Sequence, residues 1–294
     1  MSLAGRINPD WASLAAGATL VGALAVLPAV TASAQSTEEH TLRVFPRRPL
    51  FAPLSADPRW PRIGVAYMYY FRNSQFAHVG AADAGASIPV VQKKGRRTGA
   101  WEVGIQGGIF AIFDFGAPSS DLVNADYLGG VTFSYAFDSL VLMTRIIHQS
   151  SHLGDEYLLN NEVDRINLSF EKLEVLVSYD VRPWARVYGG PGVLLRRDPS
   201  YLERWSFQAG GEVRPFTAST KRPLQVLIAA NLNLWQETEW IPDVSVVAGA
   251  TLDPNGDSSY RVDFLLRYYV GRSPNGQFFT ERIQTLGPAV QLYF

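Results

Sequence analysis

The chain contains no cysteine among its 294 residues. A disulfide framework and a thiolate metal site are therefore excluded, and no redox compartment is indicated. The formal net charge is −1, so nothing in the overall charge favours a nucleic-acid partner. Long hydrophobic runs are also missing beyond residue 34, because charged or polar residues interrupt every apolar stretch well before the roughly 20 residues that a membrane helix needs.

The one long apolar run lies near the N-terminus. Leu14–Val30 follows a single basic residue, Arg6, and is followed by the small-residue sequence Ala32-Ser33-Ala34. This order predicts a secretory signal peptide over residues 1–34 and export through the Sec route. An uncleaved membrane anchor is the alternative interpretation of the same run.

Most of the remaining chain alternates with a period of two. In Trp101–Phe113 the apolar side chains share one face, whereas Glu102 and Gln106 lie on the other. Tyr260–Val270 repeats the pattern, with charged residues on its second face. Alternation over ten or more residues predicts half-buried strands that are longer than the usual five or six residues.

Strand length separates the two architectures that fit this pattern. A soluble sandwich buries its apolar faces between two sheets, whereas a membrane barrel turns them toward lipid and needs strands of about 9–11 residues. The C-terminal segment Gly287–Phe294 ends on an aromatic residue and resembles the C-terminal signature of bacterial outer-membrane barrels. We therefore predict an all-β fold, a transmembrane antiparallel β-barrel of twelve strands over residues 62–294, or ten if Ser87–Gln92 is not a strand. A secreted sandwich remains the alternative.

Residues 35–61 are rich in proline, which excludes a helix or a central strand. We expect an extended strap on the periplasmic side, with a plug or a partner-binding segment as the alternative. In the barrel itself, short turns are expected at the periplasmic end and longer loops at the extracellular end.

Charged residues within the strands define the inward face. An arginine facing lipid at mid-membrane costs about 2–4 kcal/mol, so Arg145 must point into the lumen. The predicted inward set carries both signs, and its members are expected to pair within a narrow lumen. This set is Arg145, Arg165, Arg204, Glu212, Arg214, Arg261, Asp263 and Arg267.

The same alternation places His148 and Ser150 on the outer wall, at the lipid headgroup level. In the following strand, Ile166, Leu168 and Phe170 are expected to face lipid, which turns Asp164 outward as well. A serine nucleophile, a histidine base and a carboxylate that orients the histidine together perform acyl transfer. A plain polar strand end is the alternative.

The alternation reverses near Glu171-Lys172, where we expect a β-bulge. In the loop before it, the carboxylates of Asp155 and Glu156 are candidate ligands for a hard cation such as Ca²⁺, or simply part of a solvated acidic loop.

The segment His148-Gln149-Ser150 resembles the active-site motif of outer-membrane phospholipase A, a twelve-stranded barrel. The resemblance implies His148 as base, Ser150 as nucleophile, Asp164 in place of an asparagine, and a calcium ion at the oxyanion site. The lipid A deacylase barrel also uses His-x-Ser, with a glutamate, which implies Glu156 as the rival third member. The chain departs from the phospholipase at Ser151-His152, where that family has Asn-Gly, and at Leu153, where it has arginine.

A wider resemblance covers nearly the whole mature chain. It rests on segments that include LFAPLSADPRWPR, WEVGIQGGIFAIF, LVNADYLGG, HQSSHLGDEYL and RINLSFEKLEVLVSYD. Together they look like an exported family, domain of unknown function family 1207. This resemblance implies an outer-membrane barrel but no established activity.

The sequence thus predicts a lipid-directed serine esterase with its site on the outer wall, and a non-enzymatic passive pore or structural barrel as the alternative. Expected partners are outer-membrane phospholipid or lipopolysaccharide and the barrel assembly machinery. Aromatic residues are expected to form girdles at the membrane interfaces. They are Tyr67, Tyr69, Trp101, Trp184, Trp205, Trp235 and Trp240.

Overall fold

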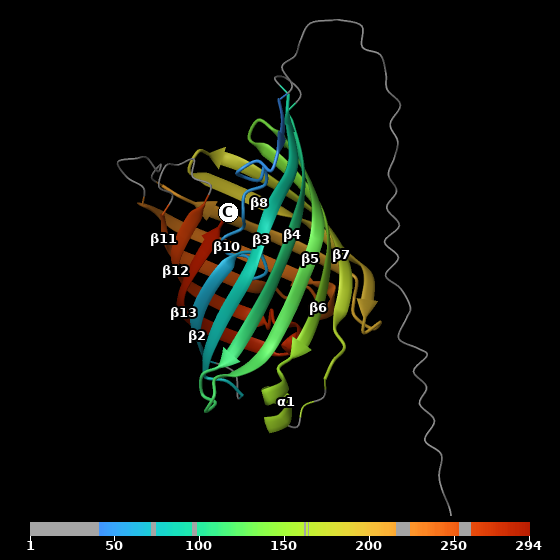
Figure 1. The fold of residues 1–294 in the computed structure, drawn as a ribbon, viewed down its shortest axis with the longest axis vertical. Helices are drawn as coiled ribbons and strands as arrows, with labels where there is room; N and C mark the ends of the chain where they lie inside the picture. The colour runs from blue at the N-terminus through green and yellow to red at the C-terminus, as the bar shows by residue number, and fades with distance from the viewer. Residues whose placement is uncertain are drawn as a thin grey trace, which may run out of the picture. The chain divides into compact units, whose positions relative to one another are not determined.

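A computed structural model describes residues 41–71, 75–95, 99–161, 163, 165–215, 224–252 and 260–294. These residues form one antiparallel sheet of 13 strands, in which β2 pairs with both β13 and β3 and β3 also pairs with β4. Strands β2 to β13 therefore close into a ring of twelve (Figure 1), as predicted. No helix of the described chain is long and apolar enough to span a membrane.

The strands are β1 (Thr41–Val44), β2 (Ile63–Tyr70), β3 (His78–Lys94), β4 (Ala100–Asp114), β5 (Asp121–Phe137), β6 (Leu140–Leu153), β7 (Ser169–Arg182), β8 (Ala185–Asp198), β9 (Trp205–Val213), β10 (Leu224–Trp235), β11 (Asp243–Leu252), β12 (Arg261–Arg272) and β13 (Arg282–Tyr293). The uncertain segment Ser87–Gln92 is part of β3. Short helical turns lie in three loops: α1 (Asp155–Asn160), η1 (Gln236–Thr238) and η2 (Gly276–Phe278). The predicted signal peptide lies outside the described residues and stays a prediction.

The predicted facing of the strands is confirmed in β6 and β12. Phe264 and Leu266 are 50% and 52% exposed on the outer wall, whereas Asp263 and Leu265 between them are buried. Arg145 is buried inside the barrel, where its guanidinium binds Glu174. The outer wall is therefore apolar and the lumen polar, as lipid outside the barrel requires.

Most of the predicted girdle aromatics are exposed. Tyr67, Tyr69, Trp184, Trp205 and Trp240 are each more than a third exposed. Trp235 was predicted wrongly, because its ring lies beneath the ammonium group of Lys172, whose side chain is buried within the barrel.

Ion pairs fill much of the lumen, as expected from its mixed charges. Glu174 binds both Arg145 and Lys172, Glu212 binds both Arg186 and Arg214, and Asp263 binds Arg261. Arg165 and Arg204 were assigned to this face wrongly: both are exposed and precede the strands β7 and β9. Strand alternation therefore does not govern where they point.

The proline-rich segment before β2 lies inside the barrel. β1 pairs with the end of β3, and nine of the residues 51–62 that follow are buried. Phe51 stacks on Trp60 with 5.8 Å between ring centroids, and both pack against Met143, Leu176 and Tyr188 of the wall.

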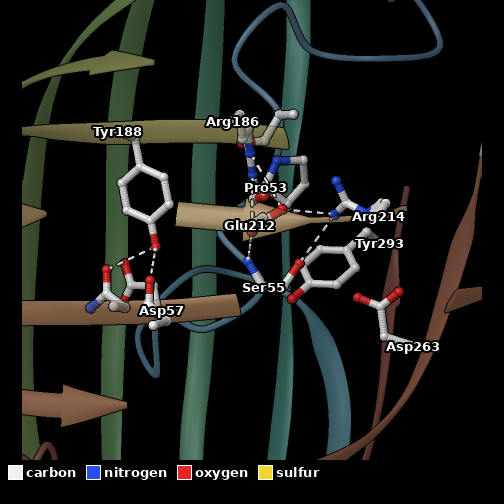
Figure 2. Close-up of polar contacts among 12 residues, drawn as sticks. Pro53, Ser55, Asp57, Arg186, Tyr188, Glu212, Arg214, Asp263 and Tyr293 are labelled. Atoms are coloured by element: carbon white, nitrogen blue, oxygen red, sulfur yellow. Dashed lines mark hydrogen bonds and ion pairs between the residues drawn. The ribbon is translucent and has the colours of Figure 1, made fainter. Parts of the chain in front are cut away.

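Inward polar side chains bind the backbone of this segment (Figure 2). The Ser55 N–H donates to Glu212 Oε1 at 2.7 Å, and the Leu50 N–H donates to Glu102 Oε2 at 3.0 Å. Arg186 Nη1 donates to the Ala52 carbonyl at 3.0 Å. These bonds satisfy backbone groups that a proline-rich coil cannot pair with itself.

Residues 51–62 are therefore a plug, hereafter the plug segment. The prediction of an extended periplasmic strap does not describe these residues, and the plug alternative does. The β12–β13 loop fills the other end of the lumen, where Gly276 and Gln277 donate backbone N–H groups to Asp126 and Asn124 of β5. Arg59 of the plug segment binds the Pro274 carbonyl of this loop, so the two segments meet.

Candidate functional site on the outer wall

The candidate site lies on the outer wall near the loop end of β6. His148 is exposed and Ser150 is half-buried, and both lie on the face opposite Arg145, where the alternation predicts them. Two residues that are two positions apart in a strand point to the same face, with their Cα atoms about 6.6 Å apart. Ser150 pairs across the sheet with Tyr127 of β5 and Ser169 of β7.

The imidazole of His148 is held by a carboxylate from the neighbouring strand. His148 pairs directly with Glu171 of β7, and His148 Nδ1 donates to Glu171 Oε1 at 2.9 Å. Arg196 of β8 donates to the same oxygen at 3.1 Å. Three adjacent strands thus contribute a histidine, a glutamate and an arginine to one row of the wall.

This hydrogen bond selects the tautomer of His148. A proton on Nδ1 that is donated to Glu171 leaves Nε2 as an acceptor. That is the tautomer in which an imidazole can take the proton of a serine hydroxyl, and the carboxylate also stabilises the imidazolium that then forms.

Glu171 is the residue of the candidate site that the sequence analysis missed. Leu168 and Phe170 were expected to face lipid, but they are buried in an interior cluster with Leu194 and Leu202. Phe170, Lys172 and Glu174 point inward, so Glu171 points outward. The sequence did contain a sign of this. Leu173, Val175 and Val177 are apolar and odd-numbered, and the same alternation continued toward the N-terminus places Glu171 on their outward face.

The bulge expected in β7 at Glu171-Lys172 is absent, and the register shift at this point leaves its extra residue in the partner strand β8. The β7–β8 pairing passes from Glu171↔Arg196 to Lys172↔Leu194, which leaves Leu195 as the additional residue. Strand β7 keeps its regular register with β6. The bulge thus lets Arg196 and Leu195 both reach the outer surface, where they are exposed.

The other predicted site residues do not contact His148 in the described chain. Asp164, the predicted third member, lies outside the described residues. Its rival Glu156 and the neighbouring Asp155 form the first turn of α1, where both are exposed. The facing argument that turned Asp164 outward is wrong, since it depended on Leu168 and Phe170 facing lipid.

A calcium ion is not a good fit to the described residues around Ser150. Its paired neighbours, Tyr127 and Ser169, offer hydroxyl oxygens rather than carboxylates. Glu171 already binds His148 and Arg196. Within the described ranges, no three His, Asp or Glu side chains lie close enough to hold a metal.

The wall beside His148 is open on the β5 side. The partner of His148 there is Gly129, and the next in the row is Gly107 of β4. A Cβ built on Gly129 would meet no heavy atom within 4 Å. A molecule lying on the outer wall can therefore approach the imidazole from this side without displacing a side chain.

A closed ring of twelve antiparallel strands, apolar outside and polar within, defines an outer-membrane-type β-barrel. Within that class, the chain belongs to the family described as "Protein of unknown function (DUF1207)", which it matches over residues 23–294. No curated protein matches the chain.

Solved structures agree on the fold. Outer membrane phospholipase A from Escherichia coli is 10% identical with a TM-score of 0.56, over 84% of this chain and 95% of that chain. The Salmonella typhi outer membrane phospholipase, described as a dimer with bound calcium, is 11% identical with a TM-score of 0.56, over 80% and 93%. At such low identity the likeness concerns the fold and not the activity.

Proposed function

We propose that this protein is an outer-membrane lipid hydrolase whose catalytic residues are Ser150, His148 and Glu171. The observation that carries the proposal is the hydrogen bond from His148 Nδ1 to Glu171 Oε1 at 2.9 Å, two residues from a serine on the same face. The barrel likeness to outer membrane phospholipases supports the same reading. A lipid in the surrounding leaflet reaches this site laterally, without entering the plugged lumen.

In the proposed reaction, Ser150 Oγ attacks the carbonyl carbon of a lipid ester while its proton passes to His148 Nε2. The tetrahedral oxyanion collapses, and the leaving alcohol takes the proton from the imidazolium. Water then attacks the acyl-enzyme with His148 as base, which releases the fatty acid and restores the serine. We assign the positive charge that stabilises the oxyanion to Arg165, whose Nη2 donates to His152 Nδ1 at 3.3 Å beyond Ser150 on the same wall. The mechanism contains no step through calcium.

Replacement of Glu171 by glutamine tests the third position. Glu171→Gln keeps the size of the side chain but removes the charge that stabilises the imidazolium, so we expect kcat on phospholipid micelles to fall about 10²-fold. Glu156→Gln is the matched control and should retain wild-type kcat. If Glu156→Gln lost activity and Glu171→Gln did not, the rival third member would be correct.

Filling the open wall at Gly129 tests the direction of approach. Gly129→Leu places a side chain beside His148. A Cβ atom at this position has no heavy atom within 4 Å, so the barrel should fold normally. We expect kcat/KM for a long-chain phospholipid to fall at least about tenfold, because a branched side chain then occupies the approach to the imidazole. Hydrolysis of p-nitrophenyl acetate, a short soluble ester, should change much less. Val131→Leu, on the same face, is the control, and equal long-chain rates in the two variants would contradict the proposed approach.

A further inference from the structure

A cavity of about 150 Å³ lies in the lumen at the end where the longer loops gather. Pro58 and Arg59 of the plug segment and residues of the β12–β13 loop contribute to its lining, together with wall residues of β6, β7, β8, β10, β11 and β12. Its volume would hold roughly ten water molecules. The outer-wall site does not use this space, because His148 and Ser150 face away from it.

The walls of the cavity are strongly aromatic. Phe170, Trp235, Tyr269 and Phe279 all line it. Trp235 already lies beneath an ammonium group, since Lys172 Nζ is 4.2 Å from its ring centroid. Aromatic faces attract cations, and the attraction is stronger where water is excluded.

The charged residues of the lining favour a positively charged ligand. Among the described residues they are three carboxylates, Glu203, Glu237 and Asp243, and two guanidinium groups, Arg59 and Arg272. The charge of Arg59 is matched by its contact with Asp126. Arg272 Nη1 donates to the Thr280 carbonyl, which is neutral, so the charge of Arg272 still offsets one of the three carboxylates. The carboxylates are therefore in excess.

Asp243 is the central acidic group. Its side chain is buried, and Oδ1 accepts a hydrogen bond from the Arg272 backbone N–H at 2.6 Å. The carboxylate is thus fixed in place by the backbone while it borders the cavity. A buried carboxylate beside aromatic rings is a pairing that suits an organic cation better than a hydrated metal ion.

We propose that this cavity binds a small organic cation, with Asp243 supplying the opposite charge and Trp235 and its aromatic neighbours the walls. Glu203 and Glu237 lie where the cavity meets the loops, and Glu203 is exposed, so they attract the cation toward the entrance. The proposal does not depend on the esterase activity of the outer wall.

Calorimetric titration of the purified full-length protein in detergent micelles tests this site. Choline chloride is the probe, and 3,3-dimethylbutan-1-ol, which has the same shape without the charge, is the matched control at equal ionic strength. We expect saturable choline binding and no saturable binding of the neutral alcohol. Absence of choline binding, or equal binding of the two compounds, would overturn the proposal.

Two variants locate the binding. Asp243→Asn keeps the acceptor for the Arg272 N–H and should weaken choline binding at least tenfold, and Trp235→Leu should also weaken it. Asp138→Asn, at a turn of the opposite end where asparagine tolerates the positive φ of 51°, is the control and should bind like the wild type. Undiminished binding by Asp243→Asn, in a variant that keeps its barrel circular dichroism, would refute the role of Asp243. Glu171→Gln should bind choline normally, which separates this site from the esterase.

Discussion

Ser150→Ala is expected to lose lipid ester hydrolysis by at least about 10³-fold in kcat while the barrel stays intact. The serine hydroxyl forms the covalent bond to the acyl group, and nothing replaces it in alanine. Ser150 is half-buried and pairs with Tyr127 and Ser169 through the backbone, which alanine preserves. Fatty-acid release from phospholipid in mixed micelles is the measurement.

The control for this experiment is Ser151→Ala. Ser151 is the next residue of β6, but its side chain is buried and its Oγ donates to Asn124 Oδ1 inside the barrel. The Ser151→Ala variant should therefore retain the wild-type kcat. Both variants and the wild type are to be purified from a host without its own outer-membrane phospholipase. Equal rates for wild type and Ser150→Ala would remove Ser150 from the mechanism, and equal losses in both variants would indicate a structural effect.

Glu212→Ala should destabilise the barrel by roughly 3–5 kcal/mol. Glu212 is buried and joins three partners: it binds Arg186 and Arg214 and accepts the Ser55 N–H of the plug segment. Alanine leaves the buried guanidinium group of Arg186 and the partly buried one of Arg214 without their counter-ion, and one backbone donor without an acceptor. The free energy of unfolding in urea, with the protein in detergent, is the measurement.

Asp180→Ala provides the comparison for Glu212→Ala. Asp180 is an exposed carboxylate near the end of β7, where a substitution should change the unfolding free energy by less than about 0.5 kcal/mol. Glu212→Gln should fall between the two, because its amide oxygen still accepts the Ser55 N–H while the charge is lost. A loss below about 1 kcal/mol for Glu212→Ala would show that the plug segment is held by packing alone.

The barrel follows from the sequence because its strands obey one local rule. Arg145 cannot face hydrocarbon, Phe264 gains nothing by facing a polar lumen, and each fixes the parity of its strand. This rule placed His148 and Ser150 on the outer wall. It failed for Arg165 and Arg204, which precede their strands, where no ladder dictates the direction of a side chain.

The plug segment and Glu171 depended on contacts that no local pattern encodes. Proline excludes strand and helix for residues 46–61. The partners of that segment on the barrel wall lie more than 50 residues away in the sequence, as in the bond between Ser55 and Glu212. Phe51, Leu54 and Trp60 were the available signal, since a solvated strap has no reason to carry them. The His148–Glu171 pair likewise depends on how the long β6–β7 loop sets the register between two strands.

Both ends of the plug segment are anchored at the same rim of the barrel. On one side β1 pairs with Val91–Lys94, beside the β3–β4 turn, and on the other β2 starts at Ile63, opposite Leu292 near the C-terminus. The segment is therefore a tethered loop that can be withdrawn toward that rim but cannot pass through the other. If that rim faces the periplasm, a force directed toward the periplasm withdraws the segment and unblocks the lumen, whereas the two tethers resist a force directed outward.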